Sequence, residues 1–433
     1  MAYRFVHAAD LHLDSPLRSL ALRDPDLAGL IGNATRRAFE RIVDLCLHEA
    51  VDALILAGDL YDGDQTSMKT ARFLAEQIRR LHGAGVRTFV IRGNHDALSK
   101  ITKELAFPET VSVYTGRGEA IAHDRAAGGF DVVVHGLSFA QPHALEGLLP
   151  KYRSPVADAV NIGIMHTSLG GAEGHDPYAP CAPADLHAFG FDYWALGHIH
   201  RREVVGGSAR STAAVVMPGM PQGRDINEAG AKSVTLVTVA DDRTITLEER
   251  LTSVAQFERV SVDLGGAEDW SAVAAAIDAA LGTARDAARS EHLVARLRVT
   301  GTTPLAWRLR RDLDLLKAEA DDRASVLGRT WIEKIEMDCA APSAGASGSA
   351  AVPPGDPFAE LRQLIAEDVL HSDAFRAEMA AVAEELRLAL PPECRALLGS
   401  DPAGFDAALA AIVADGAEDV LARLHGAAAA EPV

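Results

Sequence analysis

Five short polar motifs, each placed directly after a short apolar run, constrain this chain more than any other feature. Runs of this kind separated by helical stretches are typical of the strands of an α/β fold. Because strand ends gather at one edge of such a sheet, we expect the motifs to meet there. In chain order they are Asp10-Leu11-His12, Gly58-Asp59-Leu60-Tyr61-Asp62, Gly93-Asn94-His95-Asp96, His166 alone, and Gly197-His198-Ile199-His200.

The stretches between the motifs support this interpretation. Two of them have apolar residues at helical spacing, Arg36–Ala50 and Ser67–Leu81. From about Ser211 onwards only short strand-like runs follow, which predicts hairpins that complete a sheet. The strands that we expect before that point are Arg4–Ala8, Ala53–Ala57, Thr88–Ile91, Asp131–Val134, Ile162–Met165 and Tyr193–Leu196.

The rest of the chain predicts three further segments after a first domain of residues 1–252. Residues 253–339 have a β-α-β-α-β pattern, with helices expected at Trp270–Leu281 and Pro304–Ala320, and we interpret them as a small α/β capping domain. Residues 340–356 are almost entirely Ala, Ser, Gly and Pro, which predicts a flexible linker. Residues 357–433 are expected to be helical, with Ser372 capping one helix. The apolar stripes of these helices either pack on each other or contact a partner.

The charge excludes one class of protein. The 433 residues include 42 Lys and Arg against 61 Asp and Glu, a formal net charge of −19. Such a chain repels bare polyanions on average, so it is not a protein that coats nucleic acid by bulk charge. Residues 357–433 have 14 acidic residues and five arginines, so −9 of that charge lies in the predicted helical tail.

The cysteines and the apolar runs predict a cytoplasmic location. The four cysteines have no Cys-x-x-Cys spacing, which argues against a disulfide framework or a zinc knuckle. No apolar run approaches the roughly 18 residues of a membrane span, and no secretory signal is visible. We therefore expect no membrane partner.

The five motifs together predict a centre with two divalent metal ions. Carboxylate, imidazole and amide oxygen form a mixed set of ligands that suits Mn²⁺ or Fe²⁺. The carboxylate of Asp59 is able to bridge two cations about 4 Å apart, as two-metal hydrolases require. Taken singly the motifs are weak, because an Asp-x-His pair occurs by chance and His166 alone could be a core histidine. The alternating pair His198 and His200 is more specific, since both imidazoles point to one face of an extended chain.

The order and composition of these motifs resemble the calcineurin-like metallophosphoesterases. The resemblance implies an α/β/β/α sandwich of two β-sheets flanked by helices, with a dinuclear site at one edge. It also implies that His95 contacts the substrate phosphate or protonates the leaving group, and that Asp96 and Asp62 orient it. Carried onto matching positions, the family's pattern gives Asp10, His12, Asp59 and His200 to one metal, and Asp59, Asn94, His166 and His198 to the other.

Further segments resemble the YhaO-like branch of the SbcD-type DNA repair exonucleases. They are FVHAADLHLDSPL, GHDPYAPCAPADL and PGMPQGRDINEAGAKSVTLV, and the resemblance spans roughly residues 1–340. Met220 and Trp307 depart from that branch's pattern without touching a predicted ligand. The resemblance implies an exonuclease or endonuclease of DNA with two divalent metal ions, Mn²⁺ first and Fe²⁺ as the alternative. It also implies an SMC-like ATPase partner, SbcC-like or YhaN-like, and a homodimer.

The basic residues have less specific interpretations. Arg308, Arg310 and Arg311 form a cluster that either follows a phosphate backbone or is a solvated helix face. Two other functions stay open: a phosphoesterase that acts on a small phosphodiester or phosphomonoester, and a non-catalytic subunit of an SMC-like ATPase complex. The candidate substrate-binding residues are Arg18, Arg201, Tyr178 and Arg224.

Overall fold

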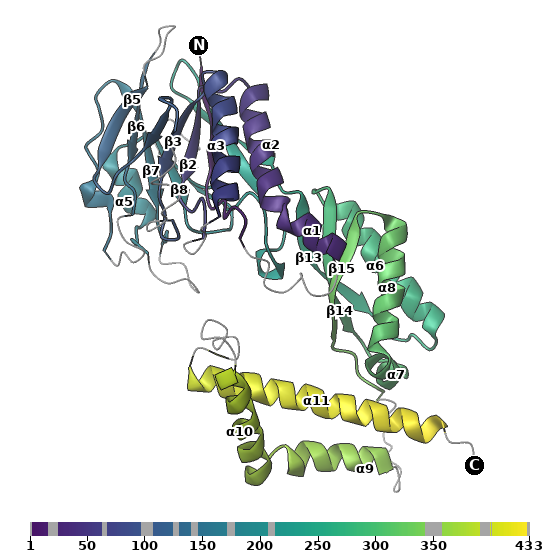
Figure 1. Cartoon of the computed structure of the whole chain (residues 1–433). Coiled ribbons are helices and arrows are strands. Elements are labelled where there is room, and N and C mark those ends of the chain that lie inside the picture. The colour runs from purple at the N-terminus through teal and green to yellow at the C-terminus, as the bar shows by residue number, and fades with distance from the viewer. Residues whose placement is uncertain are drawn as a thin grey trace. The chain divides into compact units, whose positions relative to one another are not determined.

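The computed structural model divides into two compact units (Figure 1). One unit contains residues 1–259, 284–296 and 329–333, and the other contains residues 260–283, 297–328 and 334–433. The structure describes residues 2–15, 25–62, 67–96, 107–123, 130–139, 146–170, 178–206, 213–342, 357–389, 399 and 401–430.

The first unit is built on two six-stranded sheets. The first has the order β12-β11-β1-β2-β3-β4 and the second β5-β6-β7-β8-β10-β9. The strands of the first sheet are β1 (Tyr3–Ala8), β2 (Ala53–Ala57), β3 (Arg87–Ile91), β4 (Val111–Val113), β11 (Ser233–Val239) and β12 (Ile245–Leu251). Those of the second are β5 (Glu119–His123), β6 (Asp131–Gly136), β7 (Ala159–His166), β8 (Tyr193–Gly197), β9 (Glu203–Val205) and β10 (Ala214–Met217).

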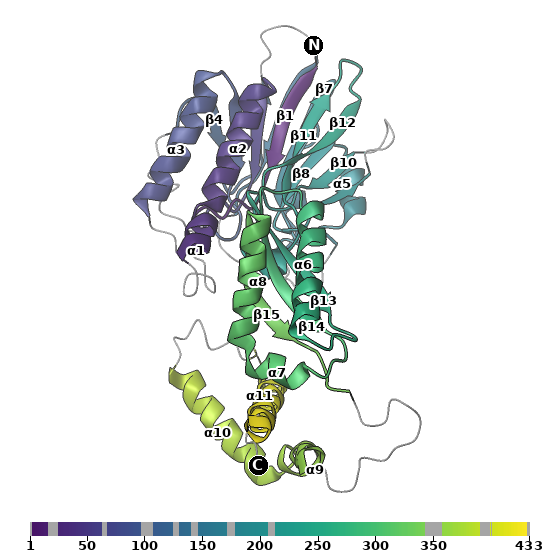
Figure 2. The ribbon, with the colours of Figure 1, turned by 90° about the vertical axis from the view of Figure 1, so that its right-hand side faces the viewer.

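Helices cover the outer faces of the two sheets, which gives the layers seen edge-on in Figure 2. The helices α2 (Ala34–His48) and α3 (Met68–Gly83) cover the first sheet, and α5 (Pro183–Phe189) packs on the second. The remaining elements of this region are α1 (Pro25–Gly32) and the short 3₁₀ turns η1 (Leu149–Lys151) and η2 (Ile226–Glu228). The predicted α/β/β/α sandwich is therefore confirmed.

The alternation of side chains along each buried strand produces these layers. In β1, Val6 and Ala8 pack towards α2 and α3, whereas Phe5 packs into the core between the two sheets. In β8, Trp194 lies in the core beneath α5, and its neighbour Tyr193 lies between the sheets. Both faces of the central strands are thus buried, which explains why the sequence shows continuous apolar runs there.

Parallel pairing brings the predicted motifs to one edge of the sandwich. Strand β2 pairs in parallel with both β1 and β3, and β7 pairs in parallel with both β6 and β8. The carboxyl ends of β1, β2 and β3 therefore lie side by side in one sheet, and those of β7 and β8 in the other. All five motifs follow or end one of these five strands.

A third sheet has the order β13-β14-β15. Its strands are β13 (Ala255–Asp263), β14 (His292–Thr300) and β15 (Thr330–Met337), and each contributes residues to both units. They are connected through α6 (Trp270–Ala287), α7 (Ala306–Arg311) and α8 (Leu313–Leu327). The single helix predicted at Pro304–Ala320 is in fact two helices, because the backbone of Asp312 departs from helical geometry, with φ −103° and ψ 39°.

The C-terminal region is helical, as predicted. It contains α9 (Pro357–Leu364), a π-helical turn η3 (Ile365–Val369), α10 (Asp373–Ala389) and α11 (Pro402–Ala430). The hydroxyl of Ser372 accepts a hydrogen bond from the amide of Phe375 (3.4 Å), so the predicted cap is present. Most of the predicted linker, residues 343–356, lies outside the described residues, and the domain boundaries stay a prediction. In the part of the chain that the structure describes, no helix combines the length and apolar character needed to span a bilayer.

Candidate metal centre

The loops that carry the predicted ligands leave their strands in strained backbone conformations. Asp10, His12, Asp59 and His198 have φ values of +53°, +41°, +53° and +103°, in the region that residues with side chains rarely adopt. Such conformations cost about 1–3 kcal/mol each and concentrate at functional sites. Backbone hydrogen bonds fix the first two loops to each other, since the amide of Asp10 donates to Gly58 O (3.0 Å) and that of His12 to Asp59 O (3.1 Å).

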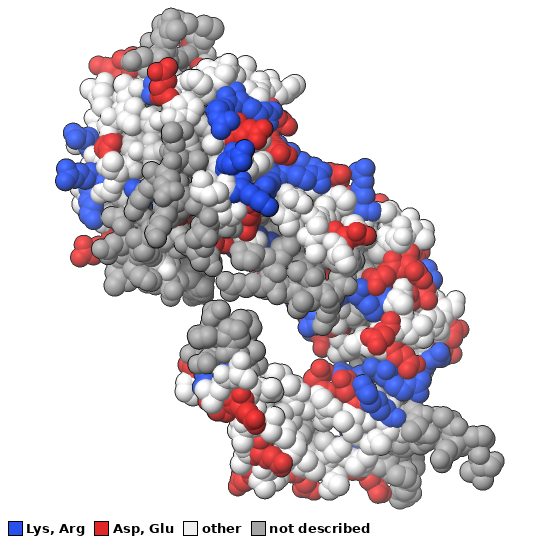
Figure 3. Space-filling model, viewed as in Figure 1, with Lys and Arg blue, Asp and Glu red and all other residues white. Residues whose placement is uncertain are grey.

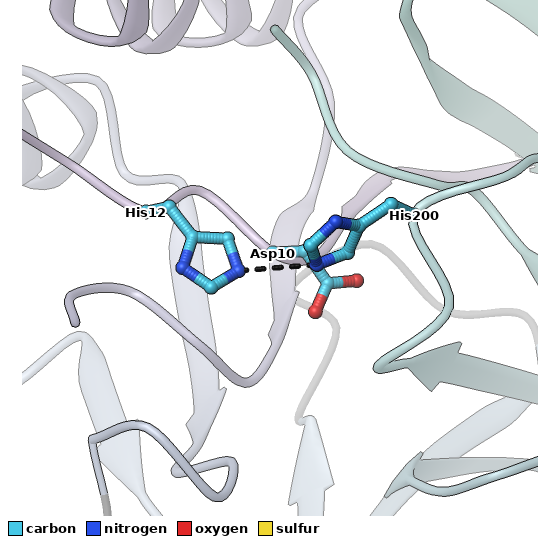
Figure 4. Close-up of side chains that lie close together, drawn as sticks. All are labelled: Asp10, His12 and His200. Carbon is cyan, nitrogen blue, oxygen red and sulfur yellow. Dashed lines mark hydrogen bonds between the residues drawn. The ribbon is translucent and has the colours of Figure 1, made fainter. Parts of the chain in front are cut away.

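Two histidine nitrogens face each other at the centre of this edge (Figure 4). The Nε2 atoms of His12 and His200 are 3.2 Å apart, and Asp10 lies beside them. The Nδ1–H of His12 donates to Asp62 (2.7 Å), and that of His200 donates to Glu228 (2.9 Å). A neutral imidazole with its proton on Nδ1 has only a lone pair on Nε2. Two lone pairs thus point at one another, and a cation between them would make this arrangement favourable.

A second group of acceptors converges on His166. Its Nδ1–H donates to the carbonyl of Ala57 (2.9 Å), so its Nε2 carries a lone pair in the neutral ring. This Nε2 lies 2.9 Å from Asn94 Oδ1 and 3.3 Å from Asp59 Oδ2. The same Asp59 oxygen is 4.0 Å from Nε2 of His12. Asp59 therefore contacts residues of both predicted ligand sets, as a bridging carboxylate must.

Asp10 and His198 complete the predicted set. The backbone amide of His198 donates to both carboxylate oxygens of Asp10, at 3.0 Å each. The ring of His198 lies 5.2 Å from that of His166 and 5.1 Å from that of Tyr178, measured between ring centroids. All seven predicted ligands therefore lie in one cluster, six of them buried and His200 partly exposed.

Glycines make room for this packing. A Cβ atom at Gly93 would lie 2.2 Å from Asp59 Oδ1 and 2.8 Å from His166, and a Cβ at Gly197 would lie 2.1 Å from Ala57 O. Gly58 combines φ +94° with a Cβ position 2.5 Å from Nδ1 of His166. These three motifs thus need their glycines because predicted ligands, or the carbonyl of Ala57, occupy the space of a side chain.

The buried carboxylates of the cluster stabilise positive charge next to them. Burial lowers the pKa of His166, but the carboxylates of Asp59 and Asp10 outweigh that effect and raise it to about 9. Burial would raise the pKa of Asp59, yet His166 and the other imidazoles hold it below its usual range. The chain therefore has carboxylate, imidazole and amide oxygen donors around a buried point that favours cations. This donor set fits divalent metal ions.

His95, the predicted proton donor, lies at the rim of the cluster. Its ring is 5.0 Å from that of His12, and its side chain is 45% exposed, so a substrate can reach it. Its Nδ1 lies 3.3 Å from Asp62, and this carboxylate raises the pKa of His95. Asp62 thus contacts both His12 and His95.

Asp96 makes different contacts from those expected of a residue that orients His95. Its two oxygens accept the backbone amides of Leu60 (2.9 Å) and Gly93 (2.6 Å), so it fastens two of the loops together. Burial, with the nearby Asp59, raises the pKa of Asp96 to about 7. Asp62 lies beside the ring of His95, and the backbone amide of His95 donates to Asp59 Oδ1 (3.0 Å). A catalytic part for Asp96 stays a prediction.

The four candidate substrate-binding residues have different positions. Arg18 lies outside the described residues. Arg201 is exposed, directly after His200. Tyr178 stacks edge-on against His198. Arg224 is ion-paired with Glu228 (2.6 Å), a residue to which the sequence interpretation gave no role. The signal that could have identified Glu228 was its place in the stretch PGMPQGRDINEAGAKSVTLV, four residues after Arg224.

These features define a metal-dependent phosphoesterase, and the chain belongs to the calcineurin-like metallophosphoesterases. Residues 3–202 match the family described as calcineurin-like phosphoesterase. Within that group the chain belongs with the YhaO-like proteins, since residues 257–340 match the middle domain of metallophosphoesterase YhaO. It is 33% identical over 303 residues to "Uncharacterized metallophosphoesterase YhaO" of Bacillus subtilis, which covers 69% of this chain and 72% of that protein.

More distant similarity extends to two proteins whose names describe nucleases or DNA repair. The chain is 28% identical over 235 residues to "DNA double-strand break repair protein Mre11" of Methanopyrus kandleri, covering 51% of this chain and 49% of that protein. It is 25% identical over 289 residues to a subunit of the nuclease SbcCD of Bacillus subtilis, covering 58% of this chain and 70% of that protein. The chain thus spans about half the length of that Mre11 protein.

Proposed function

We propose that this chain hydrolyses phosphodiester bonds of DNA, as an exonuclease or endonuclease in repair, with two divalent metal ions, Mn²⁺ or Fe²⁺. Asp10, His12, Asp59 and His200 hold one ion, and Asp59, Asn94, His166 and His198 hold the other. The observation that carries the proposal is the position of Asp59 Oδ2, 3.3 Å from His166 and 4.0 Å from His12. The names of the Mre11 and SbcCD relatives support DNA as the substrate.

Bound divalent ions would supply positive charge for the phosphate oxygens and a water of lowered pKa as nucleophile. The protein's own residues have three tasks around them. Asp62 and Glu228 hold His12 and His200 with their Nε2 lone pairs inward. Asp59 and Asn94 place acceptor oxygens next to His166. His95, kept protonated to higher pH by Asp62, donates a proton to the leaving oxygen.

The assay that tests this function uses purified protein on end-labelled single-stranded and double-stranded DNA. The protein is stripped of metal and then supplied with Mn²⁺, Fe²⁺ or Zn²⁺ in turn. Asp59→Asn is the inactive control, because it removes the bridging charge. Cleavage by the wild type with Mn²⁺ supports the proposal. Turnover of bis-p-nitrophenyl phosphate with no cleavage of either DNA would show a small-molecule phosphoesterase instead.

We also propose that the chain works with an SMC-like ATPase, SbcC-like or YhaN-like, and as a homodimer. The support is the name of the SbcCD relative, which describes one component of a complex. The C-terminal helices also expose large apolar side chains, among them Leu364, Leu386 and Ile412. Light scattering on the purified chain tests the dimer, and co-purification with a co-expressed ATPase from the same genome tests the complex. A monomer, or an ATPase that elutes separately, would contradict the respective part.

A further inference from the structure

A closed series of polar contacts connects the two histidines that face each other. From His12 it runs through Asp62 to Arg224, from Arg224 to Glu228, and from Glu228 to His200. The distances are 2.7 Å, 3.9 Å, 2.6 Å and 2.9 Å in that order. The 3.2 Å approach of the two Nε2 atoms closes the ring.

Arg224 occupies the middle of this ring, between two carboxylates that each hold one histidine. Its Nη2 is 2.6 Å and its Nε 3.2 Å from Glu228 Oε1, and its backbone amide donates to Glu228 Oε2 (2.7 Å). Its Nη1 faces Asp62 at 3.9 Å and the hydroxyl of Ser15 at 3.4 Å. Its side chain is 24% exposed, so most of the guanidinium is engaged within the protein.

The charges explain why an arginine is needed at this point. Glu228 accepts the Nδ1–H of His200 (2.9 Å), and the same carboxylate pairs with Arg224 (2.6 Å). One guanidinium thus lies between two carboxylates that would otherwise repel each other. An ionised carboxylate accepts the Nδ1–H of its histidine strongly, which fixes the tautomer that leaves the Nε2 lone pair free for a metal.

We propose that Arg224 and Glu228 are positioning residues that set the affinity of this histidine pair for its divalent metal, and that Arg224 does not contact the substrate. This inference rests on the proposed ligand set and not on DNA as the substrate. It replaces the prediction that Arg224 binds substrate, because its contacts with Glu228 and Ser15 already engage its guanidinium.

The test measures Mn²⁺ binding without any substrate. Calorimetric titration and the Mn²⁺ electron paramagnetic resonance signal are recorded for the wild type, Arg224→Gln, Glu228→Gln and Glu228→Ala. Removing a residue that orients a metal ligand typically weakens metal binding about 10- to 100-fold. We expect losses in that range for Glu228→Ala and about tenfold for Arg224→Gln. Glu228→Gln should be intermediate, because its amide oxygen still accepts the Nδ1–H of His200.

The matched control is Arg323→Gln, which breaks a pair of the same type and spacing, Glu319 with Arg323 at 2.7 Å. It should bind Mn²⁺ like the wild type. Thermal unfolding in EDTA checks that each variant folds. If Arg224→Gln does not fold, the near-isosteric Glu228→Gln tests the proposal in its place. Unchanged Mn²⁺ affinity in the variants, with a raised KM for bis-p-nitrophenyl phosphate, would overturn the proposal and make Arg224 a substrate contact. A wild-type protein that binds no divalent metal would overturn it too, whereas metal binding without DNA cleavage would leave it standing and refute only DNA as the substrate.

Discussion

The Nε2 atoms of His12 and His200 lie 3.2 Å apart while the Nδ1 of each ring is committed to a carboxylate. Neither Nε2 can donate to the other while both rings are neutral. The pair is therefore unfavourable without a cation and favourable with one. This relationship predicts how the metal-free protein responds to metal.

Adding Mn²⁺ to the metal-free protein should raise its thermal midpoint. A ligand at about 100 times its dissociation constant stabilises the folded state by about 2.7 kcal/mol. In His200→Gln the rise with Mn²⁺ should shrink strongly, although the midpoint in EDTA should not fall, because the repulsion between lone pairs is relieved. Differential scanning fluorimetry with and without Mn²⁺ measures both effects. An equal rise in the variant and the wild type would remove His200 from the ligand set.

Gly93→Ala should abolish most activity without unfolding the protein. The added methyl group would lie 2.2 Å from Asp59 Oδ1, so the carboxylate must move. A displacement of about 1 Å at a catalytic group costs on the order of 100-fold in rate. The matched control is Gly83→Ala in α3, where nothing lies within 4 Å of the new Cβ. Steady-state rates on bis-p-nitrophenyl phosphate compare the two, and a fully active Gly93→Ala would contradict the tight packing of Asp59.

His95→Asn should lower kcat by about 10²- to 10⁴-fold, the range expected for loss of a general acid. Its Mn²⁺ affinity should stay close to that of the wild type, because His95 is not among the proposed ligands. The exposed His48 gives a matched control as His48→Asn. Rates are measured at saturating Mn²⁺ and substrate. A variant with normal kcat and a raised KM would reassign His95 to binding.

The sandwich and the ligand cluster could be predicted because short-range patterns encode both. A continuous apolar run followed by Gly58-Asp59 or Gly93-Asn94 predicts a buried strand of a parallel sheet. The carboxyl ends of such strands lie at the same edge of the sheet. The proximity of the seven candidate ligands was therefore predictable one loop at a time, since each loop follows its own strand.

The contacts between loops were not predictable in the same way. Asp62 and Asp96 both follow ligand motifs, and the sequence does not tell which one lies on His95 and which accepts the amides of Leu60 and Gly93. The contact between Glu228 and His200 was missed because it joins two segments that are far apart in the sequence. Glu228 lies in η2, between β10 and β11, and His200 follows β8. The break at Asp312 was missed because the predicted helix has apolar residues at helical spacing on both sides of it.

The buried His7 predicts a pH dependence of stability that is separate from the metal. Its Nε2–H donates to Leu196 O (3.0 Å), and its Nδ1 lies 2.8 Å from the Tyr193 hydroxyl. Burial lowers the pKa of His7 to about 3 from 6.5. A folded pKa below the unfolded one means that the unfolded chain binds the proton first. The contribution of neutral His7 to the free energy of unfolding is thus fully present above pH 6.5. It is lost as the pH falls from 6.5 towards 3.

The slope of this loss is about 1.4 kcal/mol per pH unit for one proton. His7→Gln keeps a donor and an acceptor at this position. Between about pH 6 and pH 4, we expect the free energy of unfolding of this variant to fall by about 1.4 kcal/mol less per pH unit than that of the wild type. Urea unfolding at several pH values measures the difference. His48→Gln, on the surface, should keep the wild-type slope. Identical slopes for His7→Gln and the wild type would mean that His7 is protonated in the folded protein.

Ion pairs of Arg310 connect α7 with α11 within the second unit. Its guanidinium pairs with Asp415 (2.6 Å) and Asp419 (3.0 Å) of α11 and also donates to Met337 O (3.3 Å). On the face drawn in Figure 3 acidic side chains lie on the C-terminal helices, and one of several groups of basic side chains lies at α7. The predicted basic cluster is thus largely paired with acids, since Arg311 likewise contacts Asp312 (2.8 Å).

Arg310→Ala should loosen α11 from α7 and speed the proteolytic cleavage of α11. Asp415 and Asp419 are exposed, so solvent screens the pairs and we expect a loss of about 1 kcal/mol, or about fivefold faster cleavage. Arg311→Ala is the control, because the described partner of Arg311 is its own neighbour Asp312. Limited proteolysis followed by mass spectrometry gives the rates. In the double variant Arg310→Ala with Asp415→Asn, the effects should not add, and full additivity would show that this pair does not hold α11.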